Sequence, residues 1–345
     1  MECIHENVTS IILNMDKKKY LLIYHKDDND GVFSGAIMYN YLTHRLKVAE
    51  SDITAMGADY NMLASFITVN TPEKLHEQYT DLIMTDISFS DWKHMKALWE
   101  EFKNNFVWCD HHAPIINASV EHRFDDITGV RQTDRSAILC VWKFLYDPFD
   151  EHINDDSDQI PEVLRILSAY DSWTFDKYGY DKEFATAVNR GASDAFDLNL
   201  KEVCEYVHQM FPIGSKYEPT VEDLEKKGRI ISGYQNRTSA NIIKGSGDLS
   251  WTLDDGKRKA CALFIQGGSS SSMFTSVLGK VDNGIVFKRQ PDTKWTISLY
   301  NVSDSDKFDC GTYMKNHYGG GGHIGAAGGT ITEDEFIEIL KKKQI

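Results

Sequence analysis

Long apolar runs are missing from this sequence. No uninterrupted hydrophobic stretch approaches the roughly twenty residues that a membrane-spanning helix needs. The first residues, MECIHENVTSIILNMDKKKY, also lack the basic segment, apolar stretch and small-residue cleavage site of a secretion leader. We therefore expect no membrane among the partners of this chain.

Basic residues are in deficit. The chain has 37 Lys and Arg residues against 52 Asp and Glu residues, which gives a formal net charge of -15. Proteins that bind long nucleic acids normally do so through a basic surface, so this balance argues against long duplex DNA as a partner. A small anionic substrate is still compatible with the acidic charge if bound cations supply positive charge locally.

Cysteine is scarce, and its spacing is irregular. None of the six cysteines belongs to a CxxC pair, the spacing typical of structural zinc sites and redox motifs. Such irregular spacing suits reduced thiols better than it suits a disulfide framework or a zinc site. We therefore expect a cytoplasmic protein with reduced thiols at Cys3, Cys109, Cys140, Cys204, Cys261 and Cys310.

Apolar strands and helical patterns alternate in the first half of the chain. YLLIY at 20–24, DLIMT at 81–85 and FVWC at 106–109 are typical of buried strands, and helical spacing follows the first two. Further helices are expected at 135–146 and 161–170. Strands that alternate with helices predict a parallel sheet with helices on both of its faces.

The second half has a different pattern. ACALFI, GIVFK and WTISLY are strand candidates, followed by a glycine-rich segment and a closing helix near 335–343. Residues from about 221 to 243 are typical of a helix that connects two domains. We expect an α/β protein with a catalytic domain at 1–205, a helical connector at 206–245 and a smaller mixed-sheet α/β domain at 246–345.

Carboxylates and imidazoles follow each strong strand of the first half. Ligands of open parallel sheets bind at the carboxyl ends of the strands, beside the point where the strand order reverses. Taken singly, each of these groups also fits a turn, a helix cap or a surface pair. In chain order they are Asp28 and Asp30 after the first strand, Asp86 after the second, and Asp110, His111 and His112 after the third.

One more carboxylate, Asp171, lies in the helical segment AYDSW. A set of several carboxylates with one or two imidazoles suits hard or borderline divalent ions such as Mn²⁺ and Mg²⁺. Cysteine is absent from the set, which argues against structural zinc. The order of these groups along the chain therefore predicts a metal centre.

Five motifs occur in the order found in one known family. They are HKDDNDG at 25–31, TDISFS at 85–90, DHH at 110–112, AYDSW at 169–173 and GGGGHIGAAGG at 319–329. With them the sequence resembles the DHH phosphoesterase superfamily, which includes RecJ nucleases, nanoRNases, cyclic-dinucleotide phosphodiesterases and family II pyrophosphatases. The last motif resembles the signature of the DHH-associated C-terminal domain.

This resemblance implies two divalent ions, preferably Mn²⁺, with Mg²⁺ or Co²⁺ as alternatives. It implies that Asp28 binds the first ion, that Asp30 and Asp171 bind the second, and that Asp86 bridges them. Asp110 would orient an imidazole and His112 would face the substrate phosphate. Asp27 is an alternative to His25 in the first site. The metal ligands implied are His25, Asp28, Asp30, Asp86, His111 and Asp171, and the catalytic residues implied are Asp110, His111 and His112.

The glycine-rich segment is interpreted as a substrate clamp, because consecutive glycines let backbone amides converge on an anion. Gly320, Gly321, Gly322 and His323 would contact the substrate there, although a flexible turn is the alternative. The family often has an arginine in the strand before this loop, whereas this chain has Tyr300, which would stack on a base instead.

Arg131, Arg135 and Ser136 lie near an expected helix start, where they would help to position a phosphate. A solvated surface is the alternative reading for this segment, and these three residues are not assigned as catalytic.

The function expected from these features is metal-dependent hydrolysis of short oligonucleotides, similar to that of a nanoRNase. Cyclic or linear dinucleotides are the alternative substrates, and a RecJ-like exonuclease or a non-catalytic nucleotide-binding protein is less favoured. Family II pyrophosphatases lack the glycine-rich signature. The sequence leaves a homodimer open.

Overall fold

The computed structural model describes residues 18–146, 159–212, 214–253, 256–266, 269, 271–302, 308–322 and 324–345. The chain divides into two compact units between Arg229 and Ile230, inside the long helix α12 (Val221–Ser246). Residue 205, where we expected the catalytic domain to end, lies inside helix α11 (Leu200–Gln209), which packs into the core of the first unit.

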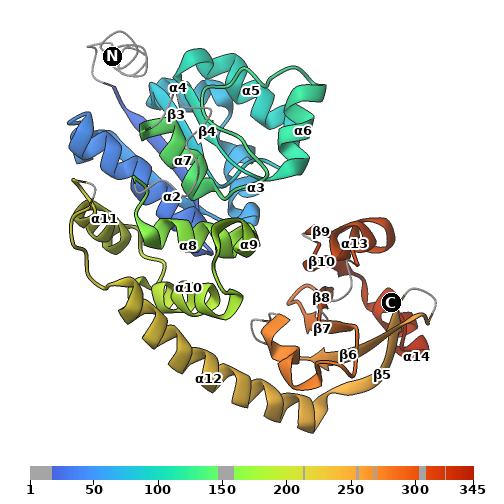
Figure 1. The fold of residues 1–345 in the computed structure, drawn as a ribbon. Helices are drawn as coiled ribbons and strands as arrows, with labels where there is room; N and C mark the ends of the chain where they lie inside the picture. Colours follow the sequence, from blue (N-terminus) through green and yellow to red (C-terminus); the bar gives the residue numbers. More distant parts are fainter. Residues whose placement is uncertain are drawn as a thin grey trace. The chain divides into compact units, whose positions relative to one another are not determined.

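The first unit is built on a parallel sheet of four strands (Figure 1). The strand order is β2-β1-β3-β4, and every neighbouring pair is parallel, as the sequence predicts. Three of the four strands match the expected segments, whereas β2 was not predicted. The strands are β1 (Tyr20–His25), β2 (Ile53–Ala58), β3 (Asp81–Thr85) and β4 (Phe106–Cys109).

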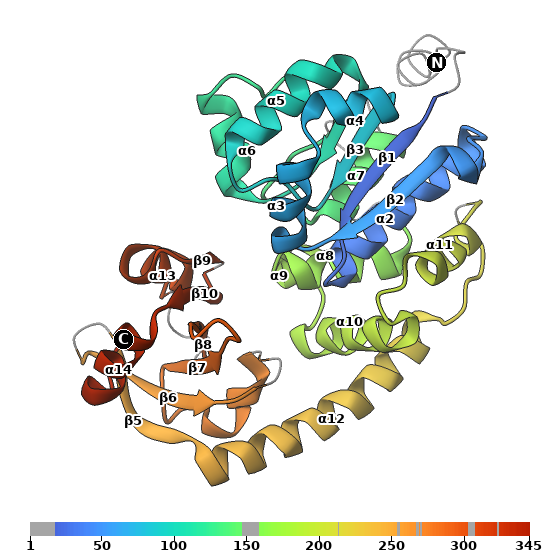
Figure 2. The same cartoon turned by 180° about the vertical axis from the view of Figure 1, so that it is seen from behind.

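Helices cover both faces of this sheet (Figures 1 and 2), which confirms the predicted layering. Alternate residues of β1 point to opposite sides, so Leu22 and Tyr24 lie in one core while Leu21 and Ile23 lie in the other. The first core includes α2 (Asn29–Asn40), α7 (Ala137–Tyr146), α8 (Glu162–Asp171), α10 (Lys182–Phe196) and α11. The second includes α3 (Tyr60–Val69), α4 (Pro72–Gln78), α5 (Trp92–Phe102) and α6 (Ala113–Glu121).

The strand order reverses between β1 and β3. From β1 the chain crosses to β2 on one side, and it then returns past β1 to β3 and β4 on the other. Ligands of open parallel sheets generally bind at the carboxyl ends of the strands beside such a reversal, which here are the ends of β1 and β3. Short helical turns complete the unit: η1 (Tyr41–Arg45), η2 (Glu50–Asp52), η3 (Lys103–Asn105) and α9 (Phe175–Tyr178).

The second unit contains a mixed sheet of six strands in the order β5-β6-β7-β8-β10-β9. Only β6 and β7 pair in parallel. The three expected strand segments and the closing helix are confirmed. The elements are β5 (Asp248–Leu253), β6 (Arg258–Phe264), η4 (Ser271–Val277), β7 (Asn283–Arg289), β8 (Trp295–Asn301), α13 (Cys310–Tyr318), β9 (Gly321–Gly322), β10 (Ala326–Ile331) and α14 (Glu333–Lys342).

Glycines in the segment from 319 to 329 allow close backbone packing. Gly321 and Gly322 form the edge strand β9, which pairs with β10. A Cβ atom at Gly320 would overlap the carbonyl group of Gly328, and one at Gly311 in α13 would overlap the carbonyl oxygen of Gly322. Larger residues at these positions would force the strands and α13 apart.

None of the helices in the described part of the chain combines the length and the apolar character that crossing a bilayer requires.

Candidate metal centre

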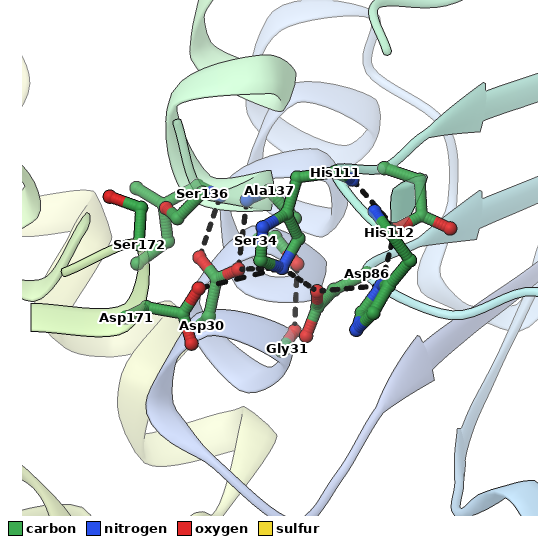
Figure 3. Close-up of polar contacts among 12 residues, drawn as sticks. Asp30, Gly31, Ser34, Asp86, His111, His112, Ser136, Ala137, Asp171 and Ser172 are labelled. Atoms are coloured by element: carbon green, nitrogen blue, oxygen red, sulfur yellow. Dashed lines mark hydrogen bonds and ion pairs between the residues drawn. The ribbon is translucent and has the colours of Figure 1, made fainter. Parts of the chain in front are cut away.

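Acidic and imidazole side chains meet at the carboxyl end of the parallel sheet (Figure 3). The first turn of α2 supplies Asp30, the residue after β3 is Asp86, and the residues after β4 begin with Asp110 and His111. Asp171 is the last residue of α8 and reaches the same place. The structure therefore brings together side chains that are up to 141 positions apart in the sequence, from Asp30 to Asp171.

His111 lies at the centre of three carboxylates. Its Nε2 atom is 3.3 Å from Oδ1 of Asp86, 3.4 Å from Oδ2 of Asp171 and 3.6 Å from Oδ2 of Asp30. His111, Asp30 and Asp86 are buried, and the Asp171 side chain is mostly buried. Like charges this close repel one another strongly away from water, so the arrangement calls for a compensating cation.

Asp30 is held by the start of a helix. Its Oδ2 accepts a hydrogen bond of 2.8 Å from the amide of Ala137, and its Oδ1 accepts one of 2.9 Å from the amide of Ile138. These are the first two residues of α7, so otherwise unpaired amides and the helix dipole stabilise the carboxylate. The neighbouring Gly31 is needed because a Cβ atom there would overlap the carbonyl group of His25.

Asp110 is fully buried and orients His112. It accepts hydrogen bonds of 2.9 Å from Nε1 of Trp108, 2.7 Å from the amide of His111 and 2.7 Å from Nδ1 of His112. Burial works to raise the pKa of Asp110, but the bond from His112 holds it below its usual value. Burial lowers the pKa of His112, and the same bond outweighs this and raises it. Asp110 thus fixes the ring and the tautomer of His112.

The charged forms of Asp86 and Asp171 are unfavourable in this environment. Burial raises the pKa of each well above its usual range, and the charge of Asp30 raises both further. Within the described residues, Oδ1 of Asp86 and Oδ2 of Asp171 are buried atoms without a hydrogen bond. Buried carboxylate oxygens normally have partners, so these two atoms are available to a cation.

Two overlapping groups of donor atoms fit a metal ion. In each group the donor atoms lie within 4.8 Å of one another, and His111 belongs to both. One or two carboxylates with imidazole nitrogens are a donor set typical of Mn²⁺ and related divalent ions. The residues present therefore fit the group that the sequence implies. The groups are Asp86, His111 and His112, and Asp30, His111 and Asp171.

His25 and Asp28 lie beside these groups. Nε2 of His25 is 3.5 Å from Oδ2 of Asp28, and the other Asp28 oxygen accepts a 2.9 Å hydrogen bond from the amide of Gly31 as the cap of α2. Burial raises the pKa of Asp28, with His25 acting in the opposite direction. Asp27, the alternative ligand, is exposed.

Tyr60 was missed by the sequence reasoning. It is the first residue of α3, just after β2, and its hydroxyl lies 3.5 Å from Nε2 of His112. Its ring centroid is 5.7 Å from that of His25. Tyr60 is 40% exposed as a whole residue, but desolvation of its hydroxyl raises its pKa and the charge of Asp110 adds to this, so the hydroxyl keeps its proton. The signal that could have found it is its position after a sheet strand, but β2 was itself not predicted.

In the segment from 131 to 136, Arg131 has a structural role. The Arg131 guanidinium donates to the carbonyl oxygens of Trp108 at 3.0 Å and Ile127 at 2.7 Å, so it ties the loop after α6 to β4. Arg135 is buried, and its Nε lies 3.5 Å from Oδ1 of Asp134. Ser136 directly precedes α7, where it adjoins the two amides that hold Asp30.

Of the residues of the second unit that are expected to contact substrate, the structure describes Tyr300 and the three glycines. Gly320 precedes β9, which consists of Gly321 and Gly322, and the hydroxyl of Tyr300 lies 2.8 Å from that of Ser269. His323 lies outside the described residues. Their contact with a substrate stays a prediction.

Residues 259–344 match the family model of the DHHA1 domain. This match covers most of the second unit, and the first unit presents the DHH segment and three further acidic motifs in one site. The second unit therefore contains a DHHA1 domain, which carries the glycine-rich motif. The acidic cluster lies in the first unit.

Solved structures agree with this fold. An exopolyphosphatase-related protein from Bacteroides fragilis is 13% identical, with a TM-score of 0.55, and the match covers 98% of this chain and 94% of that one. This likeness shows a shared fold across both domains.

Two further solved structures match with TM-scores below 0.5, so no conclusion about the fold is drawn from them. A pGpG-specific phosphodiesterase, PggH, from Vibrio cholerae is 13% identical with a TM-score of 0.43, over 94% of this chain and 97% of that one. The exonuclease RecJ bound to manganese is 13% identical with a TM-score of 0.46, over 98% and 91%. No curated protein sequence gives a significant match.

Proposed function

We propose that this chain belongs to the DHH phosphoesterase superfamily and is a metal-dependent phosphodiester hydrolase that acts on short oligonucleotides. The observation that carries the proposal is the convergence of three carboxylates on Nε2 of His111, at 3.3 to 3.6 Å, with two carboxylate oxygens left without hydrogen bonds. Such a site is unfavourable unless cations occupy it, and cations are what a phosphodiester substrate needs.

Two divalent ions, preferably Mn²⁺, would be held by His111 and the carboxylates of Asp30, Asp86 and Asp171, with His25 and Asp28 beside them. Bound there, the ions would supply positive charge to the phosphate oxygens and lower the pKa of a water molecule. Mg²⁺ and Co²⁺ are the alternatives.

The protein's own groups would orient the substrate. His112 would present Nε2 to a phosphate oxygen, because Asp110 occupies its Nδ1. Tyr60 lies next to that nitrogen and would add a second donor. His323 and the neighbouring glycines of the DHHA1 domain would capture the far end of the substrate.

A short substrate is favoured over a long one because the chain carries a net charge of -15 and because long strands need a basic surface. Cyclic or linear dinucleotides are the nearest alternatives, since the same site accommodates either ester. A cytoplasmic location would fit both kinds of substrate.

Hydrolysis of bis-p-nitrophenyl phosphate tests the reaction type. Activity should appear with Mn²⁺ and disappear with a chelator. Asp171→Asn should lower both activity and bound metal, whereas Asp292→Asn, at an exposed carboxylate of the DHHA1 domain, should change neither. Metal-independent activity, or none under any metal, would contradict the proposal.

Mass spectrometry of products from di- to decanucleotides and cyclic dinucleotides then tests the substrate. A preference for linear chains of a few nucleotides supports the proposal, and a preference for a cyclic dinucleotide replaces it with the alternative.

A further inference from the structure

Trp173 occupies a position that usually belongs to glycine. Helix α8 ends at Asp171 with Ser172 as its C-cap, and the next residue, Trp173, has a left-handed φ of 54°. The amide of Thr174 donates to the carbonyl oxygen of Ala169 at 3.1 Å. This is the hydrogen bond of a Schellman motif, in which the left-handed residue is most often glycine.

The indole does little for this turn. The hydroxyl of Ser172 bonds to the carbonyl oxygen of Ser168 and to the hydroxyl of Thr174, both at 2.7 Å, so polar groups already close the turn. The Trp173 side chain stays 52% exposed, with the Lys182 ammonium 4.8 Å from a ring centroid. The ring also contacts Phe175 edge-on, with 5.7 Å between the ring centroids. A bulky residue with φ above zero is disfavoured, and these contacts still leave about half of Trp173 exposed.

The location of the indole suggests its use. Trp173 is two residues beyond Asp171, whose Oδ2 lies 3.4 Å from Nε2 of His111 in the metal centre. Asp171 faces the site, and Trp173 is exposed two residues further along the chain, just after the end of α8. Strain and exposure that do not serve the fold point to a function when they occur next to a reaction centre.

We propose that Trp173 stacks on the nucleobase of the nucleotide that flanks the scissile phosphate. The inference rests on the proposed function and deepens it, because it gives the substrate an aromatic base and disfavours inorganic polyphosphate. Aromatic side chains stack on every base, so the contact would strengthen binding without selecting a base.

The test compares a diadenosine dinucleotide with the same compound lacking one base. The measured quantity is kcat/KM for the complete dinucleotide divided by kcat/KM for the compound that lacks one base, both in the presence of Mn²⁺. Trp173→Gly should lower this ratio between about fivefold and about a hundredfold, the range expected for loss of one stacked base. Trp173→Phe should restore most of it. Tyr234→Ala, which removes an aromatic ring exposed to 64% on α12, should leave it unchanged.

Thermal unfolding of the same variants separates stacking from a structural role. Glycine suits the left-handed position, so Trp173→Gly should melt at or above the temperature of the wild type. An unchanged substrate ratio would overturn the inference. So would a ratio that falls equally in Trp173→Phe and Trp173→Gly.

If the wild type hydrolyses neither compound, the proposed function fails by itself. Base recognition is then measured by calorimetric binding of AMP and of ribose 5-phosphate. If Trp173→Gly binds AMP more weakly than the wild type does but binds ribose 5-phosphate equally well, the stacking inference stands. If the wild type and Trp173→Gly bind AMP equally well, the inference is rejected.

Discussion

The hydroxyl of Tyr60 lies 3.5 Å from Nε2 of His112. Because Asp110 already holds the Nδ1 atom of His112, Tyr60 contacts the only ring nitrogen that is left for a substrate. A residue just after the edge strand β2 therefore joins the groups supplied by β3 and β4.

Tyr60→Phe removes the hydroxyl but keeps the ring. We expect kcat for a dinucleotide to fall about two- to tenfold, the effect of losing one neutral hydrogen bond, with a smaller change in KM. Tyr79→Phe is the matched control, because Tyr79 precedes β3 at the opposite end of the sheet. Equal kcat values for both variants and the wild type would show that the Tyr60 hydroxyl does not take part in the reaction.

Asp86→Ala should abolish turnover. Asp86 is within 3.3 Å of Nε2 of His111, and no other carboxylate of the TDISFS segment can replace it. The fold should survive, since the change removes a buried charge. Activity, bound metal and circular dichroism are measured on one preparation, with Asp292→Ala as the control. Activity within tenfold of the wild type at unchanged metal content would exclude a bridging role for Asp86.

Without metal, the acidic cluster should destabilise the fold. Burial raises the pKa values of Asp86 and Asp171 well above the ordinary value of 3.8. The folded state then binds more protons than the unfolded state above pH 3.8, so the free energy of unfolding falls as pH rises through the raised pKa values. Chelator-treated protein should therefore lose stability between about pH 4 and neutrality.

Asp86→Asn should remove part of that slope and stabilise the metal-free protein at pH 7 by on the order of 1 to 3 kcal/mol. Urea unfolding at several pH values measures both effects. Adding Mn²⁺ should stabilise the wild type more than the variant. If the metal-free wild type is as stable as Asp86→Asn at pH 7, the charge of Asp86 does not destabilise the fold and the prediction is wrong.

Cleavage should slow as the oligonucleotide lengthens, since phosphates beyond the site meet a protein of the same sign of charge. Added salt should reduce the difference, because it screens that repulsion. Rates for di-, tetra- and decanucleotides at two ionic strengths test this. Faster cleavage of the longest strand at low salt would favour a RecJ-like exonuclease.

The sequence predicts the parts of this site that local patterns encode. Strands β1, β3 and β4 are continuous apolar runs because both of their faces are buried, and the groups after them can be read directly. Strand β2, with the sequence ITAMGA, lies at the sheet edge and is only partly buried, so its pattern is weak and Tyr60 was missed with it.

The backbone support of the site could not be predicted. Asp30 meets the amides of Ala137 and Ile138, more than a hundred positions away, and backbone amides leave no residue signal. The family resemblance implied that Asp110 orients an imidazole, and the structure shows that its partner is His112.

The hold of α7 on Asp30 also bears on how far such a sequence can drift. Every amino acid except proline supplies a backbone amide, so this contact itself makes no demand on the side chains at 137 and 138. Those side chains are constrained only by their burial in the core. The position of a carboxylate fixed in this way depends on where a helix begins, and it leaves little trace in the sequence. Chains with 13% identity can therefore share a fold and still differ at the positions that support such a site.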